Sequence, residues 1–556
     1  MRKELVREKL ELIYKDGNAV DKALSLLESK LEAFTPLKPK KGLSEKDSML
    51  ITYADAVKKD GEKPLVTLKS FLDKYVKDSI ATVHILPFFP YTSDDGFSVV
   101  DYGRVNPDFG DWNDIDAISS EYGLMIDSVA NHVSKSSEWF RKYLKCEKPY
   151  TDYFITADPE ADYSSVTRPR VLPLLTKFET EEGEKYLWTT FSDDQIDLNY
   201  RCPELLVDVI MSILDYARHG ARFIRLDAIG FIWKELGTAC MHLPECHEII
   251  KLIRVLLEDY APGVMLITET NVPQKDNVSY FGSGDEAMMV YQFPLPPLVM
   301  FTLLSGNSTR LASWLKTLYR PEGKATYFNF LSSHDGVGLR PADGILTEEE
   351  KNFLVESCLR NGGKVSYKNN GDGTQSPYEL NIMYLDSLRG EGDSQDTLGK
   401  KFLAAMTILL SLQGVPGIYY HSLLGSGNDI KGMTESGIPR RINREKLSYE
   451  ELSKELDDSE SFRSVIFTSL RNMLDKREKC DAFSPYASQD VLDLDEKVFA
   501  IRRKGEKKTM TVLVNVSPSP VEIKEIGIGG KDLIKGKKYN SAFTLEPYET
   551  LWIEEE

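Results

Sequence analysis

Eight short apolar runs constrain the fold of this chain more than any other feature, because each is followed by turn residues and then by a longer amphipathic stretch. They cover residues 49–54, 82–89, 124–129, 221–227, 264–269, 287–293, 325–333 and 415–420. Apolar residues at consecutive positions are typical of parallel strands that helices cover on both faces. Eight such strands alternating with helices predict an α/β fold, namely a (β/α)8 TIM barrel. An open doubly wound sheet is the alternative that this pattern leaves.

Two intervals between these runs are longer than a simple helical crossover requires. Residues 133–200 follow the third run, and residues 336–398 follow the seventh. Both leave the carboxyl end of a strand, where barrels carry their functional loops. We therefore expect an inserted subdomain B at 133–200 and a long functional loop at 336–398.

The two ends of the chain differ in pattern from the middle. Residues 1–46 combine helical periodicity with a Pro/Lys linker, which predicts an N-terminal helical extension. Alternating strands without helices predict an all-β C-terminal domain over residues 485–556. The catalytic barrel is then expected in two parts, 47–132 and 201–484.

The charge of the chain argues against polyanionic partners. Its formal net charge is −18 and its pI is near 5.1, so nucleic acids and anionic membranes would be repelled. The first 20 residues lack the apolar core of a signal peptide, and no apolar stretch reaches the roughly 20 residues of a membrane span. Six scattered cysteines without a CxxC pair suit reduced thiols. We expect a cytoplasmic monomer or homodimer with no nucleic-acid or membrane partner.

Three of the apolar runs end in a carboxylate that opens a loop. Asp227 lies in "RLDAIG", Glu269 in "LITETN" and Asp335 in "LSSHDGVG". In a barrel all three would face the cleft at the carboxyl ends of the strands. Alternation along the strand also places Arg225 on the same face as Asp227. A buried ion pair is a poor source of stability, so this arrangement indicates chemistry.

Clustered carboxylates suit the cleavage of a glycosidic bond. Their repulsion keeps one of them protonated, while a neighbouring cation keeps another ionised, and this pair of states is what a double displacement requires. We expect Arg225 to hold Asp227 ionised as the nucleophile. Glu269 is then the general acid and base, and Asp335 stabilises positive charge on the sugar ring.

Four segments, "DSVANH", "FIRLDAIG", "LITET" and "FLSSHDG", together resemble the conserved regions of the α-amylase superfamily of glycoside hydrolases, family 13. The resemblance implies a retaining reaction on an α-glucoside, with the same three acids in the same roles. It also implies that His132, Arg225 and His334 contact the bound glucosyl ring. The chain lacks a Walker loop and a GxGxxG motif after a strand, so no organic cofactor is expected, and no ligand cluster indicates a metal.

Residues 84–115 resemble the sucrose phosphorylase branch of that superfamily, in which an acid and an aromatic residue close the glucose pocket. The matching residues are Asp94 and Phe97. The segment "PRRINRE" is similar to an arginine motif of the branch, which implies that Arg440, with Arg444 as second candidate, contacts glucose opposite Asp94. Such a pocket accepts one terminal glucosyl unit, which disfavours polymer hydrolysis.

The branch resolves its glucosyl-enzyme with phosphate and so forms α-glucose 1-phosphate. An incoming phosphate dianion requires a cation near three carboxylates. The loop at 164–173 supplies Arg168 and Arg170, and its similarity to the "RPRP" loop of the branch implies that Arg170 contacts phosphate.

Residues 332–346 are similar to the glucosylglycerate phosphorylases of this branch, which use D-glycerate in place of fructose. A carboxylate-bearing acceptor requires a fixed guanidinium, and Arg340 lies on this loop. Tyr378 matches a tyrosine of the sucrose phosphorylases, but Glu379 replaces their glutamine and Phe231 replaces one of their tyrosines. Both departures argue against fructose.

The sequence therefore predicts a phosphorylase whose partners are small molecules: a glucoside, inorganic phosphate and D-glycerate. Its expected substrate is 2-O-α-glucosyl-D-glycerate. Sucrose phosphorylase and sucrose 6′-phosphate phosphorylase are the enzymatic alternatives. A catalytically silent carbohydrate-binding scaffold is the alternative from another class, although a scaffold would not require a complete set of buried carboxylates.

Overall fold

The computed structural model describes residues 1–321, 323–369, 374–524, 527–540 and 542–555. Eight strands form a closed barrel in the order β1-β16-β12-β11-β10-β9-β4-β3. They are β1 (Met49–Thr52), β3 (Thr82–Ile85), β4 (Gly123–Ser128), β9 (Ala221–Leu226), β10 (Met265–Thr268), β11 (Met289–Tyr291), β12 (Thr326–Phe330) and β16 (Val415–Tyr419). Each strand comes from one of the eight apolar runs. The predicted TIM barrel is confirmed, and the open sheet is excluded.

The contacts of the chain divide it into two compact units. The first comprises residues 1–42, 84–270 and 276–290, and the second comprises residues 43–83, 271–275 and 291–556. The strands β4, β9 and β10 belong to the first unit, and β1, β12 and β16 to the second.

The strand register of the first unit brings charged residues together. β4 and β9 are parallel, and Asp127 pairs with Arg225 across them. On the other side of β9, Arg225 pairs with Ile267 of β10. Paired residues on one face of a sheet lie within contact distance, so the register itself places these two opposite charges side by side.

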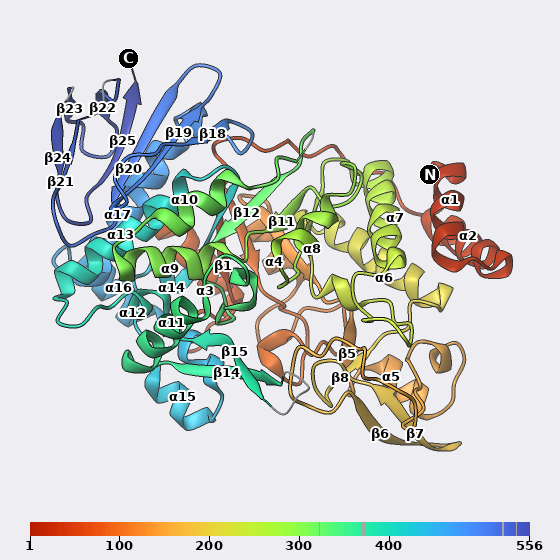
Figure 1. The fold of residues 1–556 in the computed structure, drawn as a ribbon. Helices are drawn as coiled ribbons and strands as arrows, with labels where there is room; N and C mark the ends of the chain where they lie inside the picture. The colour runs from red at the N-terminus through yellow and green to blue at the C-terminus, as the bar shows by residue number, and fades with distance from the viewer. Residues whose placement is uncertain (322, 370–373, 525–526, 541, 556) are drawn as a thin grey trace. The chain divides into compact units, whose positions relative to one another are not determined.

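Two N-terminal helices, α1 (Lys3–Tyr14) and α2 (Gly17–Leu31), form a hairpin against the barrel helices α6 (Pro203–Arg218) and α7 (Pro244–Tyr260) (Figure 1). The hairpin buries apolar residues at helical spacing and adds ion pairs between its basic residues and the acidic residues of the two barrel helices. These pairs are Lys15 with Glu245, Lys22 with Glu204, and Lys30 with Asp208. Helices are thus found where the sequence predicts them, whereas the domain boundary at residue 46 stays a prediction.

Residues 133–200 form small sheets and a helix rather than a single crossover. β5 (His132–Ser134) pairs with β8 (Gln195–Asp197), and β6 (Leu175–Thr180) pairs with β7 (Gly183–Trp188). The helix α5 (Glu138–Leu144) packs through Phe140 on Phe178 of β6, with ring centroids 4.9 Å apart.

In the second unit, the segment after β12 forms an antiparallel sheet in the order β13-β15-β14. Its strands are β13 (Val337–Gly338), β14 (Lys364–Asn369) and β15 (Gln375–Asn381). The helix α11 (Glu348–Arg360) connects β13 to β14 and begins at a capping box of Thr347 and Glu350. The long interval expected to be a functional loop is therefore a folded insertion.

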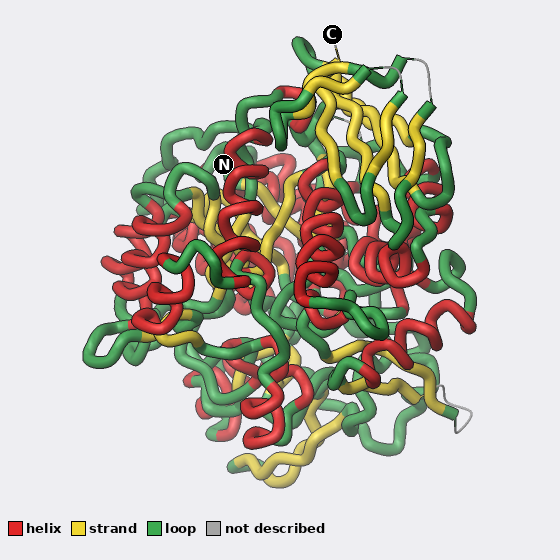
Figure 2. Tube along the Cα trace, turned by 90° about the vertical axis from the view of Figure 1, so that its left-hand side faces the viewer, coloured by secondary structure: helices red, strands yellow, loops and turns green. Residues whose placement is uncertain are grey.

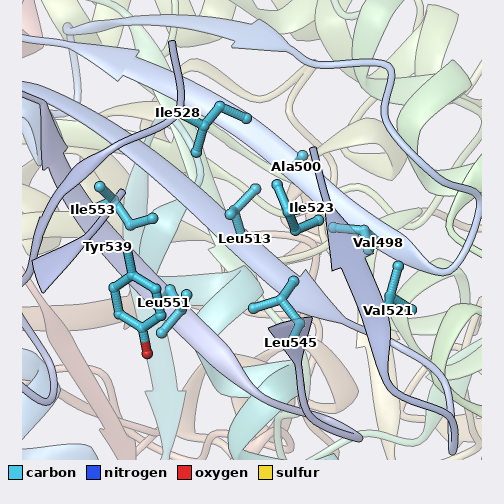
Figure 3. Close-up of a cluster of buried hydrophobic side chains, with 10 residues drawn as sticks. All are labelled: Val498, Ala500, Leu513, Val521, Ile523, Ile528, Tyr539, Leu545, Leu551 and Ile553. Atoms are coloured by element: carbon cyan, nitrogen blue, oxygen red, sulfur yellow. The ribbon is translucent and has the colours of Figure 1, made fainter. Parts of the chain in front are cut away.

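The C-terminal region is all β, as the sequence predicts. Six strands pair in the order β18-β19-β20-β25-β22-β23, and β21 pairs with β24. Figure 2 shows strands of this region, in yellow, near the C-terminus. They are β18 (Ser488–Val491), β19 (Val498–Lys504), β20 (Thr509–Asn515), β21 (Val521–Ile523), β22 (Gly530–Asp532), β23 (Lys538–Tyr539), β24 (Phe543–Leu545) and β25 (Thr550–Glu555). Side chains such as Leu513, Leu545 and Leu551 fill the space between these strands (Figure 3).

One buried arginine attaches this sheet to the rest of its unit, and another holds the residues just before the sheet. Arg503 of β19 is 0% exposed and donates to the carbonyl oxygens of Ser411 at 2.6 Å and Ser484 at 2.8 Å. Arg477, at the end of α17 (Phe462–Arg477), donates to the carbonyl oxygen of Phe483 at 3.0 Å. Burial lowers the pKa of Arg477 to about 10 and of Arg503 to about 9, so both stay charged near pH 7.

No helix in the described ranges has both the length and the apolar character needed to cross a bilayer. The six cysteines are free thiols, and five of them are buried. This agrees with the reduced thiols that the sequence predicts.

Candidate active site

Arg225 is the centre of a buried charge cluster in the first unit. Its Nη1 donates to Oδ1 of Asp127 and, at 2.8 Å, to Oδ1 of Asp227. Oδ2 of Asp127 lies 2.6 Å from Nε2 of His84. The residues His84, Asp127 and Arg225 are 1%, 0% and 3% exposed. The shared face of Arg225 and Asp227 that alternation along the strand predicts is confirmed.

Glu269, directly after β10, reaches the same guanidinium. Its Oε2 lies 3.9 Å from Nη2 of Arg225 and accepts a hydrogen bond of 3.1 Å from the backbone N–H of Ala228. Ala228 has a φ of 47°, in the left-handed region that residues other than glycine rarely adopt. This conformation directs the N–H after Asp227 to Glu269, so the two carboxylates are held around one guanidinium.

The two buried aspartates respond differently to their surroundings. Burial raises the pKa of Asp227 to about 8; Arg225 opposes this, whereas the charges of Glu269 and Asp127 add to it. Burial also opposes the ionisation of Asp127, but Arg225 and His84 outweigh it and lower the pKa of Asp127 to about 2. Arg225 lowers the pKa of Asp227, as expected, but burial acts against it more strongly, and the ionised state of Asp227 stays a prediction. Because Asp127 shares the guanidinium of Arg225, the attraction that is left for Asp227 does not offset the rise in its pKa caused by burial.

Phe97 and His132 lie against this cluster. The guanidinium carbon of Arg225 is 5.7 Å from the ring centroid of Phe97. Nε2 of His132 is 2.9 Å from the carbonyl oxygen of Phe97, and burial lowers the pKa of His132, so its imidazole is neutral near pH 7. Three residues that the sequence assigns to glucose are thus brought together.

Asp94 and Arg170, which the sequence assigns to glucose and phosphate, form an ion pair. Nη2 of Arg170 lies 3.3 Å from Oδ2 of Asp94, and its guanidinium carbon is 5.7 Å from the ring centroid of Phe191. Asp94 and Asp95 both adopt left-handed backbone conformations, with φ of 51° and 50°. Backbone strain of this kind is concentrated at functional sites, which is consistent with a ligand contact here.

A buried ammonium supports this region from within the protein. Nζ of Lys234 lies 2.5 Å from Oδ2 of Asp197 and 2.8 Å from Oδ1 of Asn131, and it donates to the carbonyl oxygen of Phe231 at 2.5 Å. Asn131 follows β4, whereas Phe231 lies in the turn that follows β9. A single side chain therefore ties together the loops of two catalytic strands.

Asp335 follows β12 in the second unit. The turn that contains Asp335 is held by the segment η7 (Pro439–Asn443) and by Arg444, which follows it. Nη1 of Arg440 is 2.6 Å from Oδ1 of Asp335, and Nδ2 of Asn443 donates to the carbonyl oxygen of Asp335 at 2.8 Å. Nε of Arg444 donates to the carbonyl oxygen of His334 at 2.8 Å, and Nε2 of His334 is 3.5 Å from Oδ2 of Asp335. His334 and both candidate arginines are thus gathered at this acid.

Glu379 of β15 is the other carboxylate on Arg440. Nε of Arg440 donates to Oε1 at 3.0 Å and Nη2 donates to Oε2 at 2.6 Å. Glu379 is 3% exposed. Glu379, one of the two residues at which the sequence departs from sucrose phosphorylases, therefore forms a bidentate ion pair with Arg440. The placement of Arg440 opposite Asp94 stays a prediction.

Arg340 and Tyr378 lie on adjoining segments of the second unit. The backbone N–H of Leu339 donates to the carbonyl oxygen of Tyr378 at 3.0 Å, and Arg340 opens the short helix η6 (Arg340–Ala342). Arg340 is half-buried, and its side chain makes no hydrogen bond or ion pair with another described residue. Its guanidinium is available to an anion.

Sequence reasoning assigned no role to Asp127, His84, Ala228 or Lys234. Asp127 and His84 carried a usable signal, because a polar side chain in the apolar runs 124–129 and 82–89 needs a buried partner. Ala228 and Lys234 carried none, because their roles depend on backbone angles and on contacts between distant segments.

A closed parallel barrel whose strand ends carry carboxylates around a buried arginine defines a class of barrel enzymes that act on glycosidic bonds. The alpha amylase catalytic domain model matches residues 68–337. Glucosylglycerate phosphorylase of Allomeiothermus silvanus is 47% identical over 99% of this chain and 98% of its own length. The Escherichia coli glucosylglycerate phosphorylase is 43% identical over 99% of this chain and 100% of its own.

A solved structure agrees with these sequence comparisons. The crystal structure of sucrose 6F-phosphate phosphorylase from Thermoanaerobacter thermosaccharolyticum superposes with a TM-score of 0.74 at 26% identity, covering 90% of this chain and 98% of that one. The chain belongs to the α-amylase family, and within it to the group that contains these glucosylglycerate phosphorylases.

Proposed function

We propose that the protein is a retaining phosphorylase that transfers glucosyl reversibly between 2-O-α-glucosyl-D-glycerate and inorganic phosphate, with α-glucose 1-phosphate as the phosphorylated product. The observation that carries this proposal is the 47% identity to a glucosylglycerate phosphorylase over 99% of the chain. The sucrose 6F-phosphate phosphorylase structure, at 26% identity, supports the same chemistry with another acceptor.

In the proposed mechanism, Asp227 attacks the anomeric carbon while Glu269 gives its proton to the departing glycerate oxygen. Phosphate then displaces the Asp227 carboxylate from that carbon and returns a proton to Glu269. The raised pKa of Asp227 supports a site that holds one proton between the two carboxyls. As the glycosidic bond breaks, positive charge develops at the anomeric carbon and stabilises the anion on Asp227, so the proton of the pair is assigned to Glu269.

The remaining site residues are assigned to the two halves of the reaction. On the glucosyl half we place Asp335 as the group that stabilises positive charge, with the contacts to the ring made by Asp94, Phe97, His132, Arg225, His334 and Arg440. The contacts of Phe97 with Arg225 through its ring and with His132 through its carbonyl oxygen support this assignment.

On the acceptor half we place Arg170, Arg340 and Tyr378. The ion pair of Arg170 with Asp94 uses one nitrogen, so the other nitrogens of that guanidinium are available to phosphate. Arg340 supplies the bidentate contact that the glycerate carboxylate requires. A cytoplasmic location is also proposed, because six unpaired cysteines suit a reducing compartment.

One assay tests this function. The protein is incubated with α-glucose 1-phosphate and, separately, D-glycerate, fructose, fructose 6-phosphate or glycerol, and released phosphate is measured. We expect release that depends on D-glycerate. Phosphate release that depends on fructose or fructose 6-phosphate instead would identify a sucrose phosphorylase or a sucrose 6′-phosphate phosphorylase. Phosphate release without any acceptor would indicate a hydrolase. No release under any condition would support a silent scaffold.

A further inference from the structure

The turn that carries Asp335 is held from two directions. From η7 and the residue after it, Arg440, Asn443 and Arg444 reach its side chain and carbonyl groups. From the inserted sheet, β15 packs directly against the next residue, because a Cβ on Gly336 would lie 2.6 Å from Cγ of Glu379. Glu379 is thus the carboxylate built into the support of this turn.

The guanidinium of Arg440 is divided between two carboxylates. Nε and Nη2 face Glu379 at 3.0 and 2.6 Å, while Nη1 faces Asp335 at 2.6 Å. The side chain of Glu379 is 3% exposed, whereas that of Asp335 is 31% exposed. The buried carboxylate therefore anchors the fork, and the third nitrogen is left to hold the more accessible one.

A glutamine cannot make this fork. Its amide offers one acceptor and one donor, so its NH2 would face an N–H of the guanidinium where a carboxylate places a second oxygen. An arginine held by one bond rather than two can rotate about that bond, and its remaining nitrogen then loses its fixed position.

We propose that Glu379 is a positioning residue that fixes Arg440 and, through it, orients Asp335; this rests on the proposed function. Glu379 adjoins Tyr378, which is assigned to the acceptor side. Glu379 nevertheless binds Arg440, and Arg440 contacts Asp335, the acid assigned to the glucosyl ring. Its influence is consequently independent of the acceptor. This distinguishes Glu379 from Arg340, whose influence is confined to glycerate.

The test compares Glu379→Gln, Arg440→Lys and the double variant. Two rates are measured with α-glucose 1-phosphate as donor: glucosyl transfer to D-glycerate and hydrolysis by water. Loss of one charge-assisted hydrogen bond corresponds to about a 10- to 100-fold change. We expect Glu379→Gln to lower kcat/KM for both reactions by the same factor within that range, and we expect the double variant to be no worse than Arg440→Lys.

A matched control is Glu350→Gln, because Glu350 pairs with Arg310 at 2.9 Å on the outside of the same unit. This variant should leave both rates unchanged. Should Glu379→Gln fold poorly, Glu379→Asp keeps the charge, and the expected loss is smaller but again equal for both reactions.

Two results would overturn the proposal. One is a loss in transfer to glycerate at least tenfold greater than the loss in hydrolysis, which would make Glu379 an acceptor contact. The other is that the losses from the two single variants multiply in the double variant, since independent action gives additive free energies. Failure of the wild-type protein to use glycerate would instead reject the proposed function, and hydrolysis would still report on Glu379.

Discussion

Replacement of Asp227 by asparagine should change how the stability of the protein depends on pH. The pKa of Asp227 rises from 3.8 to about 8 on folding, because burial outweighs its attraction to Arg225. Between these values the folded protein keeps a proton that the unfolded chain has lost. The free energy of unfolding therefore falls as pH rises through this window, by about 1.4 kcal/mol per pH unit.

The size of the effect follows from the width of the pH range. From pH 5 to pH 8 the contribution of Asp227 declines by about 4 kcal/mol. Asparagine does not titrate, and it also removes the repulsion that makes Asp227 and Glu269 compete for one proton. The stability of Asp227→Asn relative to the wild type should therefore rise by about that amount over the same range, while transfer activity is abolished.

Urea unfolding of both proteins at pH 5, 6, 7 and 8, followed by circular dichroism, measures this difference. Titrating groups outside the cluster of Asp227, Glu269, Arg225 and Asp127 are common to both proteins and cancel. Asp127→Asn provides a second comparison, because it removes a charge that raises the pKa of Asp227 and leaves Arg225 to Asp227 alone. In that variant the fall in stability between pH 5 and pH 8 should be smaller than in the wild type. Parallel profiles for Asp227→Asn and the wild type would show that folding does not raise the pKa of Asp227.

Three further predictions concern other parts of the molecule. Arg340→Ala should reduce transfer to D-glycerate by about 10- to 100-fold, through loss of a charged contact, while hydrolysis of α-glucose 1-phosphate stays within twofold; an equal loss of both would remove Arg340 from acceptor recognition. Lys234→Met leaves Asp197 buried without its cation and should lower the free energy of unfolding by about 3–5 kcal/mol in urea titrations, a value under 1 kcal/mol being inconsistent with the buried network. Arg503→Met strands buried carbonyl oxygens such as that of Ser411 and should cost about 3 kcal/mol or more in the same assay, whereas unchanged stability would mean that water replaces the guanidinium.

The barrel could be predicted because its signal is local. A strand buried on both faces shows itself as a consecutive apolar run, and run, turn and helix repeat along the chain. The same reasoning found Asp227 and Glu269, because a carboxylate at the end of such a run has few structural roles. The sequence did not show how strongly burial opposes the ionisation of Asp227, since it pairs Arg225 with Asp227 alone. The register of β4 and β9 gives that arginine to Asp127 as well.

Contacts between distant segments were beyond sequence reasoning. Glu379 and Arg440 are separated by 61 positions and meet because an inserted sheet and η7 both pack against the turn of Asp335. The sequence identified Glu379 as a departure from relatives and Arg440 as a glucose contact, without indicating that one holds the other. The left-handed conformation of Ala228 likewise has no residue signature, because glycine is the residue expected there.

The contacts of the C-terminal sheet with Ser411 limit how far the chain can be shortened without loss of stability. A fragment ending at residue 484 would retain every proposed catalytic side chain. It would nevertheless lose Arg503 and the indole of Trp552, which donate to the carbonyl and hydroxyl oxygens of Ser411. The helix that ends at Ser411 would then have unpaired carbonyl and hydroxyl oxygens and newly exposed apolar residues at its end. The C-terminal sheet is therefore part of the folded unit that carries the barrel strands β1, β12 and β16, and its removal should destabilise that unit.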